Sequence, residues 1–190
     1  MVLPIVAYGD PVLKKKANPI SKDYSLLKDL IEDMRDTMKR ASGVGLAAPQ
    51  VGLSYNLFIT DGSAFDDPEA KAFKEVFINA NIVSREGDMQ PYNEGCLSIP
   101  DIREEVRRPE KITIQYFDEN FDFHEKEYAG IVARIIQHEY DHIQGILIID
   151  HLSPLKRRIL KKRLLDISKG KVDVDYKMRF PGQKVKSKYI

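Results

Sequence analysis

The sequence predicts a single-domain α+β protein in which antiparallel sheets surround one central helix, followed by a basic C-terminal helix and a short tail. Three observations support this fold class. The chain has 190 residues, of which 43% are hydrophobic and 31% are charged, which is enough for one well-buried core but short for two. Two segments place apolar residues at helical spacing, and a third segment alternates with the period of a strand.

The first half of the chain is expected to contain an arm, a helix and two strands. Prolines interrupt the arm, and the apolar residues after it recur every three or four positions, which is typical of a helix. Gly43 is expected to end that helix, and the polar, turn-prone residues 61–69 separate the two strands. The residues concerned are Pro4, Pro11 and Pro19 in the arm, Leu27, Leu30, Ile31, Met34 and Met38 in the helix, and Tyr55 to Thr60 and Val76 to Val83 in the strands.

The second half is expected to form a hairpin and then the central helix. Residues 111–117 alternate with period two, and residues 121–128 can return beside them as a partner strand. Gly130 and Gly145 bracket the helical segment that follows as its start and stop. The apolar face of this segment contains Ile131, Val132, Ile135 and Ile136. These residues predict a buried helix.

The C-terminal region has a local excess of positive charge. Between Lys156 and Lys171 there are eight Lys or Arg residues and one Asp. A helix here would place an apolar stripe against the protein and a basic face in solvent. The stripe is expected to consist of Leu152, Leu155, Ile159 and Ile167. We expect a domain of residues 1–170 and a polar tail of residues 171–190, which adds an edge strand or is disordered.

Composition limits the partners and the compartment. Thirty basic residues against 29 acidic residues give a net charge of +1, so no global field favours binding to DNA or to a membrane surface. No apolar run approaches about 20 residues, and the first residues have neither a basic leader nor a cleavage-like site. A single cysteine excludes an intramolecular disulfide and suits a reducing compartment. We expect a cytoplasmic protein.

The run His138-Glu139-Tyr140-Asp141-His142 is the strongest functional signal in the chain. On a helix, residues four apart lie one above the other, so both imidazoles can bind one metal ion while Glu139 lies beside the open coordination position. This pattern is typical of hydrolytic metal sites. The alternative is a helix whose histidines only cap or pack.

A hydrolytic metal site usually has three protein ligands, so a third one is needed. Some metallopeptidases place it six residues after the second histidine, but that position is Ile148 here, and His151 comes nine residues after His142. Cys96 can present a thiolate from a Gly-punctuated segment before Pro100, although a lone cysteine is more often a small buried hydrophobe. His124 and His151 fall at no ligand spacing and are expected to be structural or surface residues.

A glycine-rich loop supplies a third motif. Residues 43–52 contain three glycines and one proline, which suits close approach of backbone to a ligand, and Gln50 can donate its side-chain amide. Three strings in this order resemble the peptide deformylase family: the loop Gly43–Gln50, the segment Glu94–Ser98 and the run Gln137–His142. The resemblance covers about residues 2 to 168.

The resemblance implies a metal-dependent hydrolase that removes the formyl group from the N-terminal formylmethionine of nascent polypeptides and releases formate. His138, His142 and the Cys96 thiolate would hold one divalent metal ion, which lowers the pKa of bound water toward neutrality. Fe(II) is the metal implied in the cell. Zn(II), Ni(II) and Co(II) are compatible with the same ligands.

The resemblance also implies roles in catalysis and substrate binding. Glu139 would be the general acid and base, and Gln50 with the backbone N–H of Leu97 would stabilise the oxyanion. Arg103 is expected to contact substrate, and Glu94 to orient it or the loop, with solvated surface charge as the alternative for both. Gly45 would let an extended peptide pair with backbone. An apolar pocket for a methionine-like side chain would contain Val44, Ile131 and Ile135, although each is individually more often a core residue.

Three broader interpretations stay open. The first is that the basic C-terminal helix contacts ribosomal RNA near the exit of nascent chains, with the alternative that its basic face is only solvated. A general metallopeptidase would share the two-histidine motif but would not need Cys96 or Gln50. A non-enzymatic metal-binding or ribosome-associated protein would keep the metal ligands without a function for Glu139.

Overall fold

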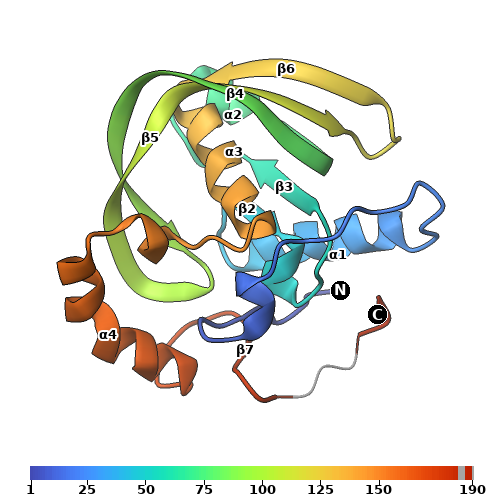
Figure 1. Ribbon diagram of the computed structural model, residues 1–190. Coiled ribbons are helices and arrows are strands. Elements are labelled where there is room, and N and C mark those ends of the chain that lie inside the picture. The colour runs from blue at the N-terminus through green and yellow to red at the C-terminus, as the bar shows by residue number, and fades with distance from the viewer. Residues whose placement is uncertain (184–186, 190) are drawn as a thin grey trace.

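The computed structural model describes residues 1–183 and 187–189. Within them, an antiparallel sheet in the order β2-β3-β4-β5-β6 surrounds helix α3, and β1 pairs with β7 in a separate parallel sheet (Figure 1). The predicted α+β class and the antiparallel main sheet are confirmed, whereas the parallel pair differs from the expectation. The elements are β1 Ile5–Val6, η1 Pro11–Lys14, α1 Leu27–Arg40, β2 Gly45–Ala47, η2 Ala48–Val51, β3 Leu57–Asp61, α2 Pro68–Ala72, β4 Lys74–Cys96, β5 Ile99–Phe117, β6 Phe123–Ala129, α3 Gly130–Ile143, η3 Ile148–His151, α4 Pro154–Ser168 and β7 Met178–Arg179.

Strands β4 and β5 form one long hairpin that dominates the main sheet. The sequence predicted only the parts farthest from the turn, residues 76–83 and 111–117, but pairing continues up to Cys96 and Ile99. Several register shifts interrupt the ladder, and the hairpin curves strongly around α3 (Figure 1). Because Cys96 pairs with Ile99, residues 97–98 form a two-residue turn at the tip.

Helix α1 confirms the predicted first helix. Its buried residues, among them Leu30 and Met34, pack against β2 and β3 and place the glycine-rich loop at the end of the helix. Gly43 follows the helix as expected, but the left-handed conformation that such a glycine would supply is adopted by Ser42, with φ 53°. The loop therefore enters β2 through a serine turn rather than a glycine turn.

Helix α3 contains the His-Glu-x-x-His run and lies at the centre of the fold (Figure 1). A left-handed Gly145 follows its end, as the sequence predicted. Its apolar face packs against β2, β3, β5 and β6 and against an aromatic cluster of Phe58, Phe77 and Tyr116. Close packing on this side fixes the rotation of the helix about its axis, and therefore the direction of its two histidines.

Helix α4 is the predicted basic helix, but it buries a different face. Its buried residues are Leu160, Leu164 and Ile167. Leu155 and Ile159 are 68% and 69% exposed, so the expected apolar stripe is wrong at these two positions. Two sets of apolar residues on α4 recur at helical spacing. Packing against β5 and in one apolar cluster with the N-terminal arm, rather than the spacing itself, determines which set is buried. No helix in the described part of the chain is both long and apolar enough to cross a membrane.

The tail after α4 returns to the N-terminal half of the protein. Its strand β7 pairs with β1, and Tyr189 is 2% exposed within the core around α1. The hydroxyls of Tyr24 and Tyr55 each donate to the carbonyl oxygen of Tyr189 at 3.2 Å. The described tail residues are thus docked. The division into a domain of residues 1–170 and a separate tail stays a prediction.

Candidate metal centre and substrate cleft

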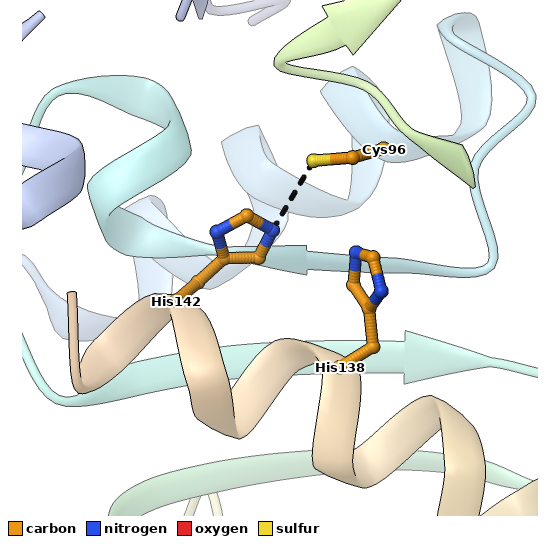
Figure 2. A group of neighbouring side chains, drawn as sticks. All are labelled: Cys96, His138 and His142. Carbon is orange, nitrogen blue, oxygen red and sulfur yellow. Dashed lines mark hydrogen bonds between the residues drawn. The ribbon is translucent and has the colours of Figure 1, made fainter. Parts of the chain in front are cut away.

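The two histidines and the cysteine of the predicted metal site lie together. His138 and His142 project from successive turns of α3, and Cys96 approaches them from the end of β4 (Figure 2). One candidate ligand atom from each residue lies within 4.8 Å of the other two, and Cys96 Sγ lies 3.4 Å from His142 Nε2. This arrangement fits one metal ion with three protein ligands.

Glu94 orients His138. Its Oε2 lies 3.0 Å from His138 Nδ1, which leaves Nε2 available to a metal ion. Arg108 donates to both oxygens of Glu94, at 2.7 and 2.9 Å, and Arg134 donates to Oε1 at 2.8 Å. A carboxylate in this position fixes the tautomer and the orientation of a ligating imidazole. In the described part of the chain, no hydrogen bond joins Glu94 to Arg103, which it was expected to orient.

Sequence reasoning missed the buried charges behind Glu94. Arg108 is 4% exposed, and its Nη1 donates to Asp141 Oδ2 at 2.7 Å. The same oxygen lies 2.7 Å from His151 Nε2, which gives His151 a structural contact. One signal for Arg108 was available, because Val106 lies two residues before it on the inward-facing side of β5.

The electrostatics of the site favour a thiolate. Burial acts to raise the pKa of Cys96, but His142 and His138 outweigh burial and lower that pKa to about 5. Burial acts to lower the pKa of His138, but its contacts with Cys96 and Glu94 raise that pKa to about 10. The pocket therefore favours a positive charge beside the thiolate, which an imidazolium or a bound cation can supply. The donor set and its charge fit a divalent metal ion.

Glu139 is buried and faces Gly45. It is 4% exposed, and its Oε2 has no hydrogen-bond partner among the described residues. Burial raises the pKa of Glu139 to about 6, although His138 and His142 act to lower it. A Cβ on Gly45 would lie 2.4 Å from Glu139 Oε1, so the glycine provides the space for this carboxylate. A buried carboxyl group with a pKa nearer neutrality is suited to proton transfer.

Gln50 and Leu97 supply two donors near Cys96. Gln50 is 1% exposed, and its Oε1 accepts from the N–H of Ala47 at 2.8 Å, which directs the side-chain amide toward Cys96 Sγ, 3.7 Å away. Leu97 begins the hairpin turn directly after Cys96, and none of the hydrogen bonds in the described ranges uses its N–H. Both groups can therefore donate to a ligand in the cleft.

A cleft of about 840 Å³ opens over these residues, within the size range of small-ligand sites. The predicted site residues that line it are Val44, Gly45, Gln50, Glu94, Cys96, Leu97, Arg103, Ile131, Ile135, His138 and Glu139. His142 lies outside this lining and is 1% exposed. Arg103 is an exposed lining residue that donates to the carbonyl oxygen of Asn93 at 3.0 Å. Tail residues 173–176 also line the cleft, which no local pattern in the tail predicts.

Comparison with known proteins assigns the chain to a family. The model of the polypeptide deformylase family matches residues 2–158. The chain belongs to this family. A peptide deformylase from Christiangramia forsetii is 54% identical over 193 residues, which cover 97% of this chain and 98% of that protein. The family resemblance inferred from the three motifs is thus confirmed.

Solved structures of deformylases share the fold. A peptide deformylase from Legionella pneumophila superposes with a TM-score of 0.78 at 37% identity, covering 90% of this chain and 98% of that one. A class I type b peptide deformylase from Acinetobacter baumannii, solved with Met-Ala-Ser bound, gives a TM-score of 0.75 at 34% identity, covering 80% and 99%. The single-domain α+β architecture is therefore that of deformylases.

Family membership decides the reaction. Polypeptide deformylases are metal-dependent hydrolases that remove the N-terminal formyl group from the formylmethionine of nascent polypeptides, and this chain is such an enzyme. Cys96, His138 and His142 form a possible metal site for it. The predicted deformylase is thus favoured over the general metallopeptidase and over the non-enzymatic metal-binding protein.

Proposed function

We propose that Cys96, His138 and His142 would hold one divalent metal ion beside the cleft. Three observations support this ligand set: the convergence of their ligand atoms, the lowered pKa of the thiol, and the hydrogen bond between Glu94 and His138 Nδ1. A metal ion held there would supply Lewis acidity, which lowers the pKa of bound water and polarises a carbonyl group.

We further propose that this metal is Fe(II) in the cell, while Zn(II), Ni(II) or Co(II) can replace it. A thiolate with two imidazoles accepts all four ions, and a thiolate-bound ferrous site would be sensitive to oxygen. The test is to remove the metal with a chelator and to reload separate samples anaerobically with each ion. Higher kcat/KM with Zn(II) than with Fe(II) would show that the proposed metal is wrong.

Glu139 is the proposed general acid and base. Water adds to the formyl carbon, Glu139 accepts the proton that the water loses, and it returns this proton to the amine nitrogen as the carbon–nitrogen bond breaks. The products are formate and a free N-terminal amine. The single observation that carries this role is the buried Oε2 of Glu139, which has no hydrogen-bond partner among the described residues and belongs to a carboxyl group whose pKa burial raises to about 6.

Gln50 and Leu97 are the proposed oxyanion donors. The carbonyl oxygen gains negative charge when water adds, and the side-chain amide of Gln50 and the N–H of Leu97 donate to it. Both donors line the cleft on the side of Cys96. Their fixed positions supply the stabilisation without reorganisation during the reaction.

The cleft suits an N-terminal methionine on an extended peptide. Val44, Ile131 and Ile135 line it and are proposed to surround the methionine side chain. Gly45 lies in β2, the edge strand of the main sheet, so a peptide can pair with the free edge of this strand. Arg103 is proposed to contact the peptide beyond the methionine. The bound Met-Ala-Ser of the Acinetobacter baumannii enzyme supports a peptide ligand for this fold.

Glu94 is proposed to act through His138 rather than on the substrate. It was predicted as part of the substrate site, where it would orient Arg103 or the loop, but it is 5% exposed and its two oxygens accept from Arg108, Arg134 and His138. A carboxylate with these bonds has little capacity left for a ligand. We therefore assign it to the support of the metal site.

Formate release from formyl-Met-Ala-Ser, compared with the acetyl analogue, tests the proposed mechanism. Glu139→Ala should lower kcat by about 100- to 10,000-fold while the metal content stays near one per chain. Glu127→Ala, which removes an exposed glutamate on β6, is the matched control and should retain full activity. An active Glu139→Ala variant, or equal rates on the formyl and acetyl peptides, would contradict the proposal.

We also propose that α4 contacts ribosomal RNA near the exit of nascent chains, and that the enzyme is cytoplasmic. The excess of basic residues between Lys156 and Lys171 and the reducing compartment that suits Cys96 support these proposals. Co-sedimentation with ribosomes at low salt should fall when Lys161 and Lys162 are replaced by Gln. Replacement of two exposed lysines elsewhere is the control, and no association at any salt would show that the proposal is wrong.

A further inference from the structure

We propose that Tyr176 is a positioning residue for the Leu97–Ser98 turn, so that the C-terminal tail forms part of the catalytic apparatus. This inference rests on the proposed role of the Leu97 N–H as an oxyanion donor. The hydroxyl of Tyr176 donates to the carbonyl oxygen of Leu97 at 2.9 Å, from a residue 79 positions away in the sequence. Tyr176 thus contacts the donor residue directly.

The conformation of the turn does not by itself fix the direction of the Leu97 N–H. Two-residue hairpin turns that match the twist of their strands have a positive φ at one or both turn positions. Neither Leu97 nor Ser98 has a positive φ. The strands would therefore splay at this tip without contacts from outside, and the ladder already shifts register between Gly95 and Cys96. The direction of the Leu97 N–H then depends on what holds the two turn residues.

Both carbonyl groups of the turn are held from outside the hairpin. The Tyr8 N–H donates to Ser98 O at 2.8 Å, and the Tyr176 hydroxyl donates to Leu97 O. These two tyrosines come from opposite ends of the chain, and the parallel pairing of β1 with β7 brings those ends together. Residues that flank the small sheet therefore hold the Leu97–Ser98 turn, which directly follows Cys96.

Tyr176 also lies in the cleft rather than behind it. Residues 173–176 line the same cleft as His138 and Glu139, and Tyr176 is half-buried there. The far end of the tail is held separately, where Tyr55 donates its hydroxyl to the carbonyl oxygen of Tyr189. Three tyrosine hydroxyls thus bond a backbone carbonyl and tie the tail to the body: that of Tyr176 at the turn, and those of Tyr24 and Tyr55 away from it.

Tyr176→Phe removes the hydroxyl at the turn, and Tyr55→Phe is the matched control. For Tyr176→Phe we expect kcat for formyl-Met-Ala-Ser to fall about fivefold, which corresponds to about 1 kcal/mol at 1.36 kcal/mol per tenfold. KM and metal content should stay unchanged, because Phe keeps the ring that lines the cleft. In the zinc-loaded protein, the NMR order parameter of the Leu97 amide should decrease. Tyr55→Phe should change neither kcat nor this order parameter.

Three outcomes would overturn the inference. The first is an unchanged kcat for Tyr176→Phe. The second is an equal loss of kcat in both variants, which would indicate a general loosening of the tail. The third is a raised KM at constant kcat for Tyr176→Phe, which would indicate that Tyr176 only lines the cleft. A wild-type protein that releases no formate, or a fully active Glu139→Ala variant, would instead contradict the proposed function. The two failures are thus distinguished in one assay.

Discussion

Replacement of Gly45 by alanine is expected to displace Glu139 and to lower activity while the fold persists. The added Cβ would lie 2.4 Å from Oε1, 2.6 Å from Cδ and 2.7 Å from Cγ of Glu139, and these are its three nearest contacts. Gly45 has no positive φ, so alanine is compatible with its backbone. Pairing of Gly45 with Thr60 restrains the strand. The side chain of Glu139 therefore has to move.

The size of the effect follows from this geometry. Ordinary van der Waals contact begins at 3.4 Å, so the carboxylate must move by 3.4 − 2.4 = 1.0 Å. A misplacement of about 1 Å can cost about 100-fold in rate. We therefore expect kcat to fall about 100-fold, equivalent to about 2.7 kcal/mol in the barrier. Overpacking should also destabilise the fold by about 1–3 kcal/mol.

The assay is steady-state formate release, with metal content and melting temperature measured on the same samples. Gly43→Ala is the control, because the nearest contact of its Cβ would be the flexible end of Leu97, Cδ1, at 2.8 Å, and the next two atoms, Gly45 O and Met38 Cγ, lie at the ordinary contact distance of 3.4 Å. We expect a loss of less than about fivefold. A folded, metal-loaded Gly45→Ala variant with kcat within about twofold of wild type would refute the reasoning. It would mean that Gly45 does not fix the Glu139 carboxylate or that Glu139 is not the acid and base.

Three further predictions concern other parts of the protein. Gln50→Ala should lower kcat by about 100- to 1,000-fold with metal content retained, since one oxyanion donor is lost; an unchanged kcat would remove Gln50 from this role. Arg108→Met should destabilise the protein by about 3–5 kcal/mol in urea unfolding, because Glu94 and Asp141 lose a buried partner. Burial acts to raise the pKa of Glu75, but hydrogen bonds from one lysine and two tyrosines outweigh burial and lower this pKa below its ordinary value of 4.5. The contribution of Glu75 to the free energy of unfolding is therefore present above that pH and is lost as the pH falls. The stability difference between wild type and Glu75→Gln should therefore shrink between pH 7 and about pH 3, and a constant difference would contradict this assignment.

Local pattern was sufficient to predict the two helices that frame the site. Helices α1 and α3 have apolar residues at helical spacing, and both form where the sequence places them. The histidine spacing on α3 depends only on helix geometry, so His138 and His142 could be assigned to one face without knowledge of the fold. The position of Cys96 beside them depends on the hairpin, and only the family resemblance linked it to the histidines.

Long-range pairing determined what local pattern did not predict. Residues 86–93 of β4 are mostly exposed and polar, and they form a strand because β5 pairs with them. The burial of Arg108 depends on compensation by Glu94 and Asp141, which lie far from it in sequence. On α4, Leu155 and Leu160 are equally apolar, and only the position of the body of the protein decides which of them is buried.

The cleft combines two parts of the chain that differ in their relation to the family. The proposed metal ligands and oxyanion donors lie within residues 2–158, the range that the family model matches. The wall formed by residues 173–176 lies outside that range, although the match to the Christiangramia forsetii protein extends over 97% of this chain. Because β1 pairs with β7, this wall is held against the Leu97 turn and not left as a free tail. The proposed chemistry therefore lies in the shared core, whereas the proposed support of one oxyanion donor comes from a segment beyond it.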